Sequence, residues 1–459
     1  MAKAPSNQTH YTRQVQLLLA KIYGRSFLKD SVVERAIKFF SNHDFVATDE
    51  AITDESQALF KLEQTERNSH LQTICYEILE LAEGNSFEEN NRKSAQLLGT
   101  IQLICPTEGK KVAKHNEQCK ALYKAILSLR LLDKLIVNNE IDDPFITQVL
   151  AEFEGQTYDD YDKSARLRFN DLIKMPLIMA ALVQDIGLYH AQGRDILYGE
   201  EGNLDPNRLL DLEDKKKLLQ INHKQTLSYI STGLGIPTYV GNSKAERDQF
   251  VLDEQHKHQF VKKLIAGSFK AKQGLGNLLK VPQIYTSIIL STKDNYNYKV
   301  LPKVYQVLNK SAELGACSQQ AVDALYQITG IFPQGYGVIF MPEDEMGHQA
   351  DCYEYAIVNR LYPPDPHHAL CRMATRKLTF ISHGHNITVK KKNNLYFPHM
   401  AKKVAKLSKE RLNEILELLA SNYKERQELD LLPRCWYANE FFSAKTNQKL
   451  WNKEENTEL

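Results

Sequence analysis

The chain has 459 residues, of which 42% are hydrophobic and 25% charged, and its formal net charge at pH 7 is +1. This length is enough for about two to four domains and at least one substantial core. Sequence-independent binding of nucleic acid needs a strongly basic face, which this balanced charge does not predict, so DNA and RNA are not expected as partners.

The seven cysteines are scattered along the chain, and none stands in a Cys-x-x-Cys motif. An odd, sparse set favours a reducing compartment and argues against a disulfide framework or a thiolate zinc site. The N-terminal residues lack the apolar core of a signal peptide. The longest apolar run, around residues 175–183, is shorter than the roughly 20 residues of a membrane-spanning helix. We therefore expect a soluble cytoplasmic protein without a membrane partner.

Residues 1–130 are predicted to be helical, because apolar residues recur at helical spacing around 17–23, 33–40 and 71–81. This region contains no group of His, Asp and Glu residues with the spacing of metal ligands. The pattern predicts an N-terminal helical region that serves as a sensor, docking or dimerisation module and that offers a surface to a protein partner.

The segment 131–332 is predicted to form a second helical region. Its main feature is an apolar helix at 164–188, which Pro176 should kink or restart. This helix carries Gln184 and Asp185 near its end, and Gly187 follows. Ser318 can cap a later helix that ends at Gly330. The other predicted helices of the chain near this region lie at 117–138, 144–154, 212–230 and from 281 onward.

From residue 333 the hydrophobic period changes from that of a helix to that of a strand. Residues 353–358 alternate as in a strand, and 377–382 and 386–390 are predicted to pair as a hairpin. We therefore expect a small β unit at 333–400, followed by a C-terminal helix and a polar tail at 401–459. The predicted fold class is mainly α, with a small β-hairpin unit near the C-terminus.

Four stretches of this sequence, in this order, resemble the HD-GYP family of bacterial cyclic di-GMP phosphodiesterases. The first is Leu182-Val-Gln-Asp-Ile-Gly187, which is similar to the Leu-x-His-Asp-Ile-Gly end of the family's metal-binding helix. The other three are the helix around His223, residues 288–296 with Asp294 before a tyrosine, and residues 322–338. The resemblance covers about 170–370 and implies an HD-domain-like helical core with a two- or three-metal site.

The sequence departs from the family pattern at several positions that carry its chemistry. Gln184 stands where the family has the histidine of its His-Asp pair, and Leu188 stands where it has the catalytic lysine. No histidine occurs between His115 and His190, where the family's first ligand is expected. The family's paired histidines and Gly-Tyr-Pro loop are absent, and His256-Lys-His258 has a different spacing.

Hydrolysis of a phosphodiester at a two-metal centre needs several imidazoles and a bridging carboxylate. The resemblance implies a metal set of Asp185, His223 and Asp294, together with His256 or His258. Imidazole suits Fe or Mn, whereas an amide is a poor ligand. The expected cofactor is therefore none, or one weakly bound divalent Fe or Mn ion. For each residue the alternative to a metal ligand is a purely structural role. Asp185 would bind backbone amides at the end of its helix, His223 would be a surface histidine, and Asp294 would be a turn residue.

Three hypotheses for the function follow. The first is a degenerate HD-GYP-like signalling protein with weak or no hydrolysis, a pseudoenzyme that binds a cyclic dinucleotide or a partner protein. The second is an active metal-dependent cyclic di-GMP phosphodiesterase in which Glu152 or Glu154 replaces the missing upstream histidine. The third is a structural interaction protein with an empty pocket.

Overall fold

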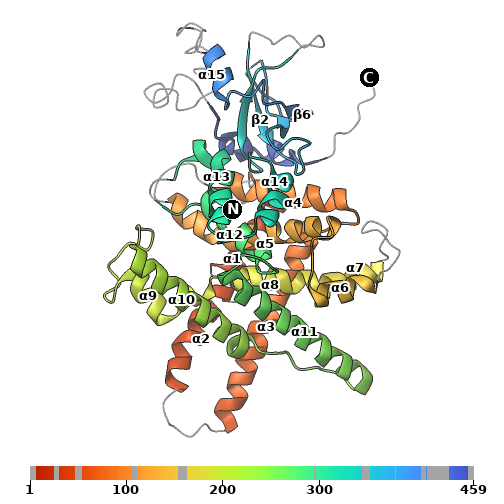
Figure 1. Cartoon of the computed structure of the whole chain (residues 1–459), viewed down its shortest axis with the longest axis vertical. Coiled ribbons are helices and arrows are strands. Elements are labelled where there is room, and N and C mark those ends of the chain that lie inside the picture. Colours follow the sequence, from red (N-terminus) through yellow and green to blue (C-terminus); the bar gives the residue numbers. More distant parts are fainter. Residues whose placement is uncertain are drawn as a thin grey trace, which may run out of the picture.

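The computed structural model describes residues 7–24, 30–46, 54–105, 111–152, 163–293, 296–343, 352–377, 379–404, 410 and 434–452. The described part is mainly helical with a small antiparallel sheet near the C-terminus, which confirms the predicted fold class. Figure 1 shows an elongated molecule with the sheet at one end. Helices fill the middle, and α2, α3 and α11 extend toward the opposite end.

The first half of the chain is helical, and its longest buried element is α5. Residue 130, where the sequence pattern ends the N-terminal region, lies inside this helix, so the backbone continues through it without a break. The helices of this half are α1 (His10–Ile22), α2 (Val32–Val46), α3 (Asp54–Ala82), α4 (Phe87–Leu103), α5 (Lys111–Val137), α6 (Pro144–Ala151) and α7 (Lys163–Phe169).

The predicted apolar helix at 164–188 forms as α7, a π-helical turn η1, α8 and a 3-10 turn η2. Pro176 lies in the first turn of α8, as predicted, and the π turn comes directly before it. A proline lacks a backbone N–H, and a local change of helix geometry accommodates that loss. The bounds of these elements are η1 (Asn170–Lys174), α8 (Met175–Val183) and η2 (Ile186–Tyr189).

The caps predicted for the last helix of the central part are confirmed. Ser318 accepts a hydrogen bond from the backbone N–H of Ala321, and Gly330 ends that helix at φ +62°. The elements are α9 (Ala191–Tyr198), α10 (Leu212–Ser228), the π turn η3 (Tyr229–Leu234), α11 (Lys244–Phe269), α12 (Asn277–Ile289), the 3-10 helix η4 (Tyr298–Lys303), α13 (Val304–Glu313) and α14 (Gln319–Thr329).

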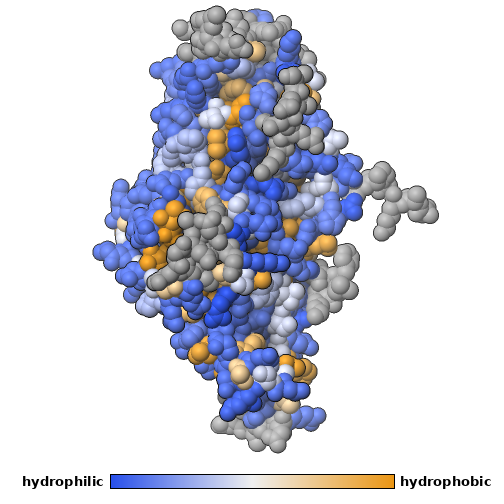
Figure 2. Space-filling model, turned by 90° about the vertical axis from the view of Figure 1, so that its right-hand side faces the viewer, coloured by the Kyte–Doolittle hydropathy of each residue, from blue (hydrophilic) through white to orange (hydrophobic). Residues whose placement is uncertain are grey.

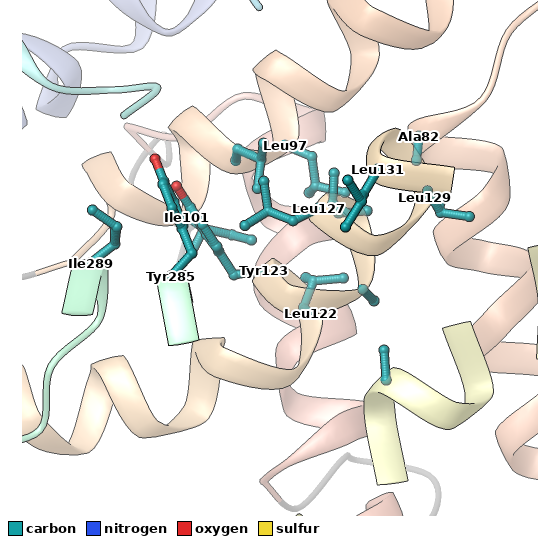
Figure 3. Packing of buried hydrophobic residues seen from close by; sticks show 14 of the residues in the cluster. Ala82, Leu97, Ile101, Leu122, Tyr123, Leu127, Leu129, Leu131, Tyr285 and Ile289 are labelled. Atoms are coloured by element: carbon teal, nitrogen blue, oxygen red, sulfur yellow. The ribbon is translucent and has the colours of Figure 1, made fainter. Parts of the chain in front are cut away.

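The core is centred on α5, which packs against α4, α8 and α12. Figure 3 shows Leu97 and Ile101 of α4 facing Leu127 of α5, with Tyr123 and Tyr285 side by side. Each of these five side chains is fully buried. Because every residue from 122 to 133 of α5 is buried, a charged residue in this stretch requires a partner nearby.

The four-stranded antiparallel sheet has the order β1-β2-β3-β6. The predicted hairpin of 377–382 with 386–390 is wrong. Residues 386–389 pair with β3, with Ala369 opposite Val389, whereas Thr379 and Phe380 pair with β4. Pairing with β3 joins four residues, while the short exposed β5 offers only two. The strands are β1 (Gly337–Phe340), β2 (Glu354–Val358), β3 (Ala369–Met373), β4 (Thr375–Arg376), β5 (Thr379–Phe380) and β6 (Asn386–Val389).

The C-terminal segment packs on the sheet through α18 (Asn439–Ser443) and the 3-10 helix η5 (Lys445–Lys449). The Trp436 indole stacks on Tyr355 and donates a hydrogen bond to the carbonyl of Ala356 at 3.1 Å. Helix α15 (Pro398–Val404) precedes this segment. The predicted helix with its apolar stripe at 412–423 lies outside the described residues.

Among the described residues, one helical stretch, Lys163–Tyr189, has the length and composition of a membrane-crossing segment. Of its most apolar window, 83% is buried inside the molecule, as in the core helix of a soluble protein. The face in Figure 2 is mostly hydrophilic, with hydrophobic residues in small separate patches. This supports the prediction of a soluble protein.

Candidate functional site

Helix α8 brings Gln184 and Asp185 to the middle of the molecule. Every residue of α8 is buried, and the chain turns into η2 directly after Asp185. Gly187 lies so close to α10 that a Cβ atom there would be 2.3 Å from the carbonyl oxygen of Asn222. The Gly187 N–H also donates to the Thr226 hydroxyl at 3.1 Å. The Asp-Ile-Gly sequence is therefore the point where α8 ends against α10.

The carboxylate of Asp185 binds two side chains from other helices. Lys124 of α5 donates to one oxygen at 2.7 Å, and Gln283 of α12 donates to the other at 2.9 Å. Asn222 of α10 adds a longer contact of 3.5 Å. Lys124 is almost completely buried, with 3% of its side chain exposed, whereas 41% of the Asp185 side chain remains exposed. Asp185 thus neutralises a buried ammonium group and also faces open space.

That open space is a cavity of about 220 Å³. The end of α1 and the start of α2 cover one side, α5 and α12 form two walls, and the end of α8 with η2 closes the remainder. The lining residues are Ile22, Tyr23, Val32, Val33, Glu117, Lys120, Ala121, Lys124, Leu182, Asp185, Ile186, Leu188, Tyr189, Gln283, Thr286 and Ser287.

The charged groups in and around this cavity do not balance. Lys120 pairs with Glu117 at 2.8 Å, and Lys124 pairs with Asp185. Two more lysines lie within electrostatic reach of these pairs: Lys280 near Asp185 and Lys124, and Lys293 near Lys120 and Glu117. Of the described lysines, only Lys120 and Lys124 line the cavity, and each has its own carboxylate partner, whereas Lys293 lies outside the lining near Lys215 and Asp205. Among the described residues, Lys280 adds one further positive charge close to the Asp185–Lys124 pair.

The pKa values of these groups follow from burial and from the neighbouring charges. Burial alone would raise the pKa of Asp185, but the ammonium groups of Lys124 and Lys120 and the Gln283 hydrogen bond hold it below its usual value. Burial lowers the pKa of Lys280 and of Lys293, and a neighbouring lysine lowers each further. Burial is therefore the main reason that the pKa of each of these two lysines lies below its usual value, although nearby carboxylates partly oppose it.

Uncharged polar groups also line the cavity. The hydroxyl of Thr286, a residue only 2% exposed, has no hydrogen-bond partner among the described residues. The rings of Tyr23 and Tyr189 meet edge to face on the opposite wall, with centroids 6.3 Å apart. The Thr286 hydroxyl oxygen is itself buried, so a ligand in the cavity meets cations on one side and aromatic surface on the other.

Gln184 and Leu188, the two positions at which this sequence departs from the HD-GYP motif, have side chains in different surroundings. Gln184 is buried away from the cavity and donates to the Ser268 hydroxyl of α11 at 3.3 Å. Its side-chain oxygen has no partner among the described residues. Leu188, in contrast, lines the cavity and contributes apolar surface where the family pattern has a lysine.

The structure does not bring the predicted histidines to Asp185. His223 stacks on Phe269 with ring centroids 4.4 Å apart, because one residue along a helix changes direction by about 100° and it is Asn222 that faces Asp185. Burial lowers the pKa of His223. His256 is exposed and packs against Phe145.

His258, the other histidine of this pair, lies in a separate small cleft of α11 with Asn68 and Gln72. Within the described ranges, no three His, Cys, Asp or Glu side chains come together as ligands of a metal ion. Asp294 lies outside those ranges. The described members of the predicted set, including Asp185 bound to Lys124, do not fit a metal centre by themselves, and a site that also uses Asp294 stays a prediction.

The suggested substitutes for the upstream histidine are Glu152 and Glu154. Glu152 forms an ion pair with Arg168 at 2.9 Å, in which both side chains are 40% exposed. Glu154 lies outside the described residues. Glu152 is therefore already paired with an arginine at the molecular surface.

Sequence reasoning missed four residues of this site: Lys120, Lys124, Lys280 and Gln283. Their spacing held a signal. Lys120 and Lys124 are four residues apart on α5, and Lys280 and Gln283 are three apart on α12, so each pair shares one helix face. Lys124 also interrupts an apolar stretch, and a lysine in a buried helix face requires a carboxylate partner.

The comparisons with known proteins add no relative. A scan against family models, a search of curated proteins and a search of solved structures each gave no match for this chain.

Proposed function

We propose that this protein is a degenerate HD-GYP-like signalling protein of the cytoplasm that binds a phosphate-bearing nucleotide without hydrolysing it. The proposal places the ligand in the cavity next to Asp185, with cyclic di-GMP as the first compound to test. The observation that carries it is the contact of Lys124 with Asp185 at 2.7 Å at the cavity wall, with Lys280 as a further cation nearby.

The Lys124–Asp185 contact argues for binding over hydrolysis. In a metal phosphodiesterase, a carboxylate at this position holds a cation that activates water and stabilises the phosphate. In this protein Lys124 and Gln283 occupy both carboxylate oxygens of Asp185. An ammonium group can attract a phosphate, but it cannot lower the pKa of a bound water as a metal ion does.

The test combines binding with turnover. Cyclic di-GMP is titrated into the protein by isothermal titration calorimetry, and the same sample is incubated with Mn²⁺ or Fe²⁺ and analysed for linear products. We expect binding, a several-fold loss of affinity in Lys120→Gln, and no turnover. Metal-dependent turnover would contradict the proposal and favour the phosphodiesterase. If neither cyclic di-GMP nor guanosine monophosphate binds, the proposal is also wrong.

A further inference from the structure

We propose that the small sheet carries a second binding surface, which holds a single strand of nucleic acid through its phosphates and its bases. The surface is centred on a groove between β4, the loop 381–385 and η5, which we call the sheet groove. The sheet lies at one end of the molecule, whereas α8 and Asp185 lie in the middle (Figure 1). The inference goes beyond the proposed function, because it concerns a different site and a different class of ligand.

The sheet region carries a local excess of positive charge. Residues 352–404 contain nine lysines and arginines but two acidic residues, although the whole chain has a net charge of only +1. Both acidic residues bind neighbours within the same region. Glu354 accepts a hydrogen bond from the Thr375 hydroxyl at 2.6 Å, and Asp365 accepts one from the backbone N–H of His367 at 2.8 Å. A clustered excess of this kind attracts a polyanion, which the net charge of the whole chain does not reveal.

The sheet groove measures about 490 Å³ and presents three basic side chains. Arg376, His383 and His385 line it, and each is exposed, with a side chain that has no hydrogen bond or ion pair to a described residue. The other described lining residues are Met373, Ile381, Ser382 and Thr446, none of which is acidic. The charge of Arg376 is therefore available to an anion.

The loop that carries the two histidines is fixed to β3. Gly384, between them, has no room for a Cβ atom, which would overlap the carbonyl oxygen of Met373. The Met373 N–H donates to the carbonyl of His385 at 3.1 Å, and Arg372 donates to the carbonyl of Gly384 at 2.8 Å. The backbone of the loop is thus held in place while both imidazole rings face the groove.

The opposite wall of the groove is fixed in the same way. The Ser382 hydroxyl donates to the side-chain oxygen of Asn447 in η5 at 2.8 Å, and the Asn447 amide donates to the carbonyl of Phe441 at 2.9 Å. These bonds join the loop to the C-terminal segment. The groove is therefore formed before a ligand enters, which lowers the entropic cost of binding.

The types of side chain in the groove favour single-stranded nucleic acid over other polyanions. A guanidinium group such as that of Arg376 binds phosphate through two parallel hydrogen bonds, and serine and threonine hydroxyls are common phosphate contacts. Unpaired bases stack on histidine rings and on the plane of an arginine. A phospholipid headgroup or an acidic peptide supplies negative charge, but it supplies no bases for the two imidazoles.

The edge strand β6 extends this surface. It pairs with β3 on one side and has no strand on its other side in the described part of the sheet. The exposed Lys390 follows β6 directly. With a rise of about 3.3 Å per residue, Lys390 lies about 17 Å along the strand from His385. A single phosphate group does not span this distance, whereas a strand of several nucleotides does.

The experiment measures binding of fluorescein-labelled oligonucleotides to the full chain by fluorescence anisotropy. The probes are a strand of about twelve thymidines, within the usual range of site sizes, and an equally long strand without bases. Both carry the same phosphates. We expect the thymidine strand to bind at least five-fold more tightly, because only its bases stack on the imidazoles. Its affinity should fall as KCl is raised, with a log–log slope of about −0.7 for each phosphate that is neutralised.

Two variants at exposed positions separate charge from stacking. Arg376→Gln should weaken binding of both strands at least three-fold and should reduce the salt slope by about 0.7. His383→Ala combined with His385→Ala should weaken binding of the thymidine strand alone. Circular dichroism melting of each variant confirms that it is folded.

Two further variants are matched controls. Lys61→Gln removes one positive charge from an exposed position of α3, the helix that extends away from the sheet (Figure 1). Lys120→Gln removes one from the Asp185 cavity. Both should bind the thymidine strand as the wild type does.

Several outcomes would overturn the inference without touching the proposed function, which concerns the other site. One is no binding of either strand, and another is binding that Arg376→Gln leaves unchanged, which would place the contact elsewhere. Equal affinity for the two strands would show a general polyanion surface in which the histidines do not stack. Phosphatidylserine vesicles are tested by sedimentation, and binding to them in place of the oligonucleotide would identify a lipid surface.

Discussion

Helix α5 takes part in two groups of charged residues that differ in access and in balance. The first, which we call the sealed cluster, consists of Arg130 and Asp133 of α5, Glu83 at the end of α3, and Lys174 of η1. Lys174 contacts Glu83 at 2.7 Å and Asp133 at 3.1 Å, and Arg130 contacts both acids. No side chain of this cluster is more than 8% exposed.

The second group surrounds Lys124 and the cavity. Lys124 is nearly as buried as Arg130 and Lys174 of the sealed cluster, but its partner Asp185 is 41% exposed toward open space. The sealed cluster has two cations and two anions, whereas the described cavity group has three lysines, Lys120, Lys124 and the nearby Lys280, and two carboxylates. The comparison suggests that buried and balanced charges join helices to one another. Charges that are unbalanced and accessible from a cavity are instead available to a ligand.

The largest expected effect breaks the sealed cluster. Arg130→Met removes one cation and leaves buried carboxylates without compensation, which costs about 3–5 kcal/mol of unfolding free energy. Chemical denaturation measured by circular dichroism tests this value. Lys120→Met, on the same helix but partly exposed, is the control and should cost less than about 1 kcal/mol. Equal costs for the two variants would show that the two groups do not differ in structural role.

The second prediction concerns the carboxylate of the cavity. Asp185→Asn removes a negative charge next to the ligand, and a unit charge at about 4 Å contributes about 1 kcal/mol even in water. We therefore expect guanosine monophosphate to bind about five-fold more tightly to this variant, as measured by calorimetry. Asp323→Asn, an exposed residue of α14, should have no effect. Loss of binding in Asp185→Asn is the behaviour of a metal ligand and would contradict a site built from lysines.

The third prediction is a smaller, pH-dependent effect on stability. The pKa of Asp185 is lower in the folded protein than in the unfolded chain, so its ion pair stabilises the fold above the unfolded value and loses this contribution as the pH falls through the folded value. The difference in unfolding free energy between wild type and Asp185→Asn should be constant from about pH 5 to 7 and should shrink below about pH 4. If the difference in unfolding free energy grows as the pH falls, this prediction is wrong.

The smallest expected effect is that of Gln184→His. Because Gln184 points toward Ser268 of α11 and away from Asp185, a histidine at this position gains no nearby metal ligand. Metal analysis of protein purified without chelator should give the same content for this variant and the wild type. A rise to one or more Fe or Mn per chain would mean that the carboxylate and the new imidazole do converge.

The sequence was sufficient for the local parts of this site. Apolar spacing and Pro176 indicated α8, and Gly187 marked the turn after Asp185, because these signals are encoded within a few residues. The partner of Asp185 was not accessible in this way, since Lys124 lies 61 residues earlier and meets it only through the packing of α5 on α8. The sequence also did not show that Asn222, rather than its neighbour His223, contacts Asp185, because the face of α10 that meets η2 is set by tertiary contacts.

The sheet shows the same limit. The alternation of apolar and polar residues predicted strands after residue 333. The predicted pairing of 377–382 with 386–390 was wrong, because residues 386–389 pair with β3 instead. Arg372 of β3 donates to the carbonyls of Leu450 and Gly384, so the pairing of this strand is fixed by the distant C-terminal segment as well. Contacts between residues so far apart in the chain leave no signature in the spacing of apolar residues.

The most direct test of the central claim is a calorimetric titration of guanosine 5′-monophosphate into the wild-type protein in excess EDTA. If Lys124 and its neighbouring lysines provide the positive charge of this site, affinity will be the same with and without the chelator. If a metal ion on Asp185 provides that charge, EDTA will abolish binding and added Mn²⁺ will restore it, which would contradict a site that relies on lysines alone.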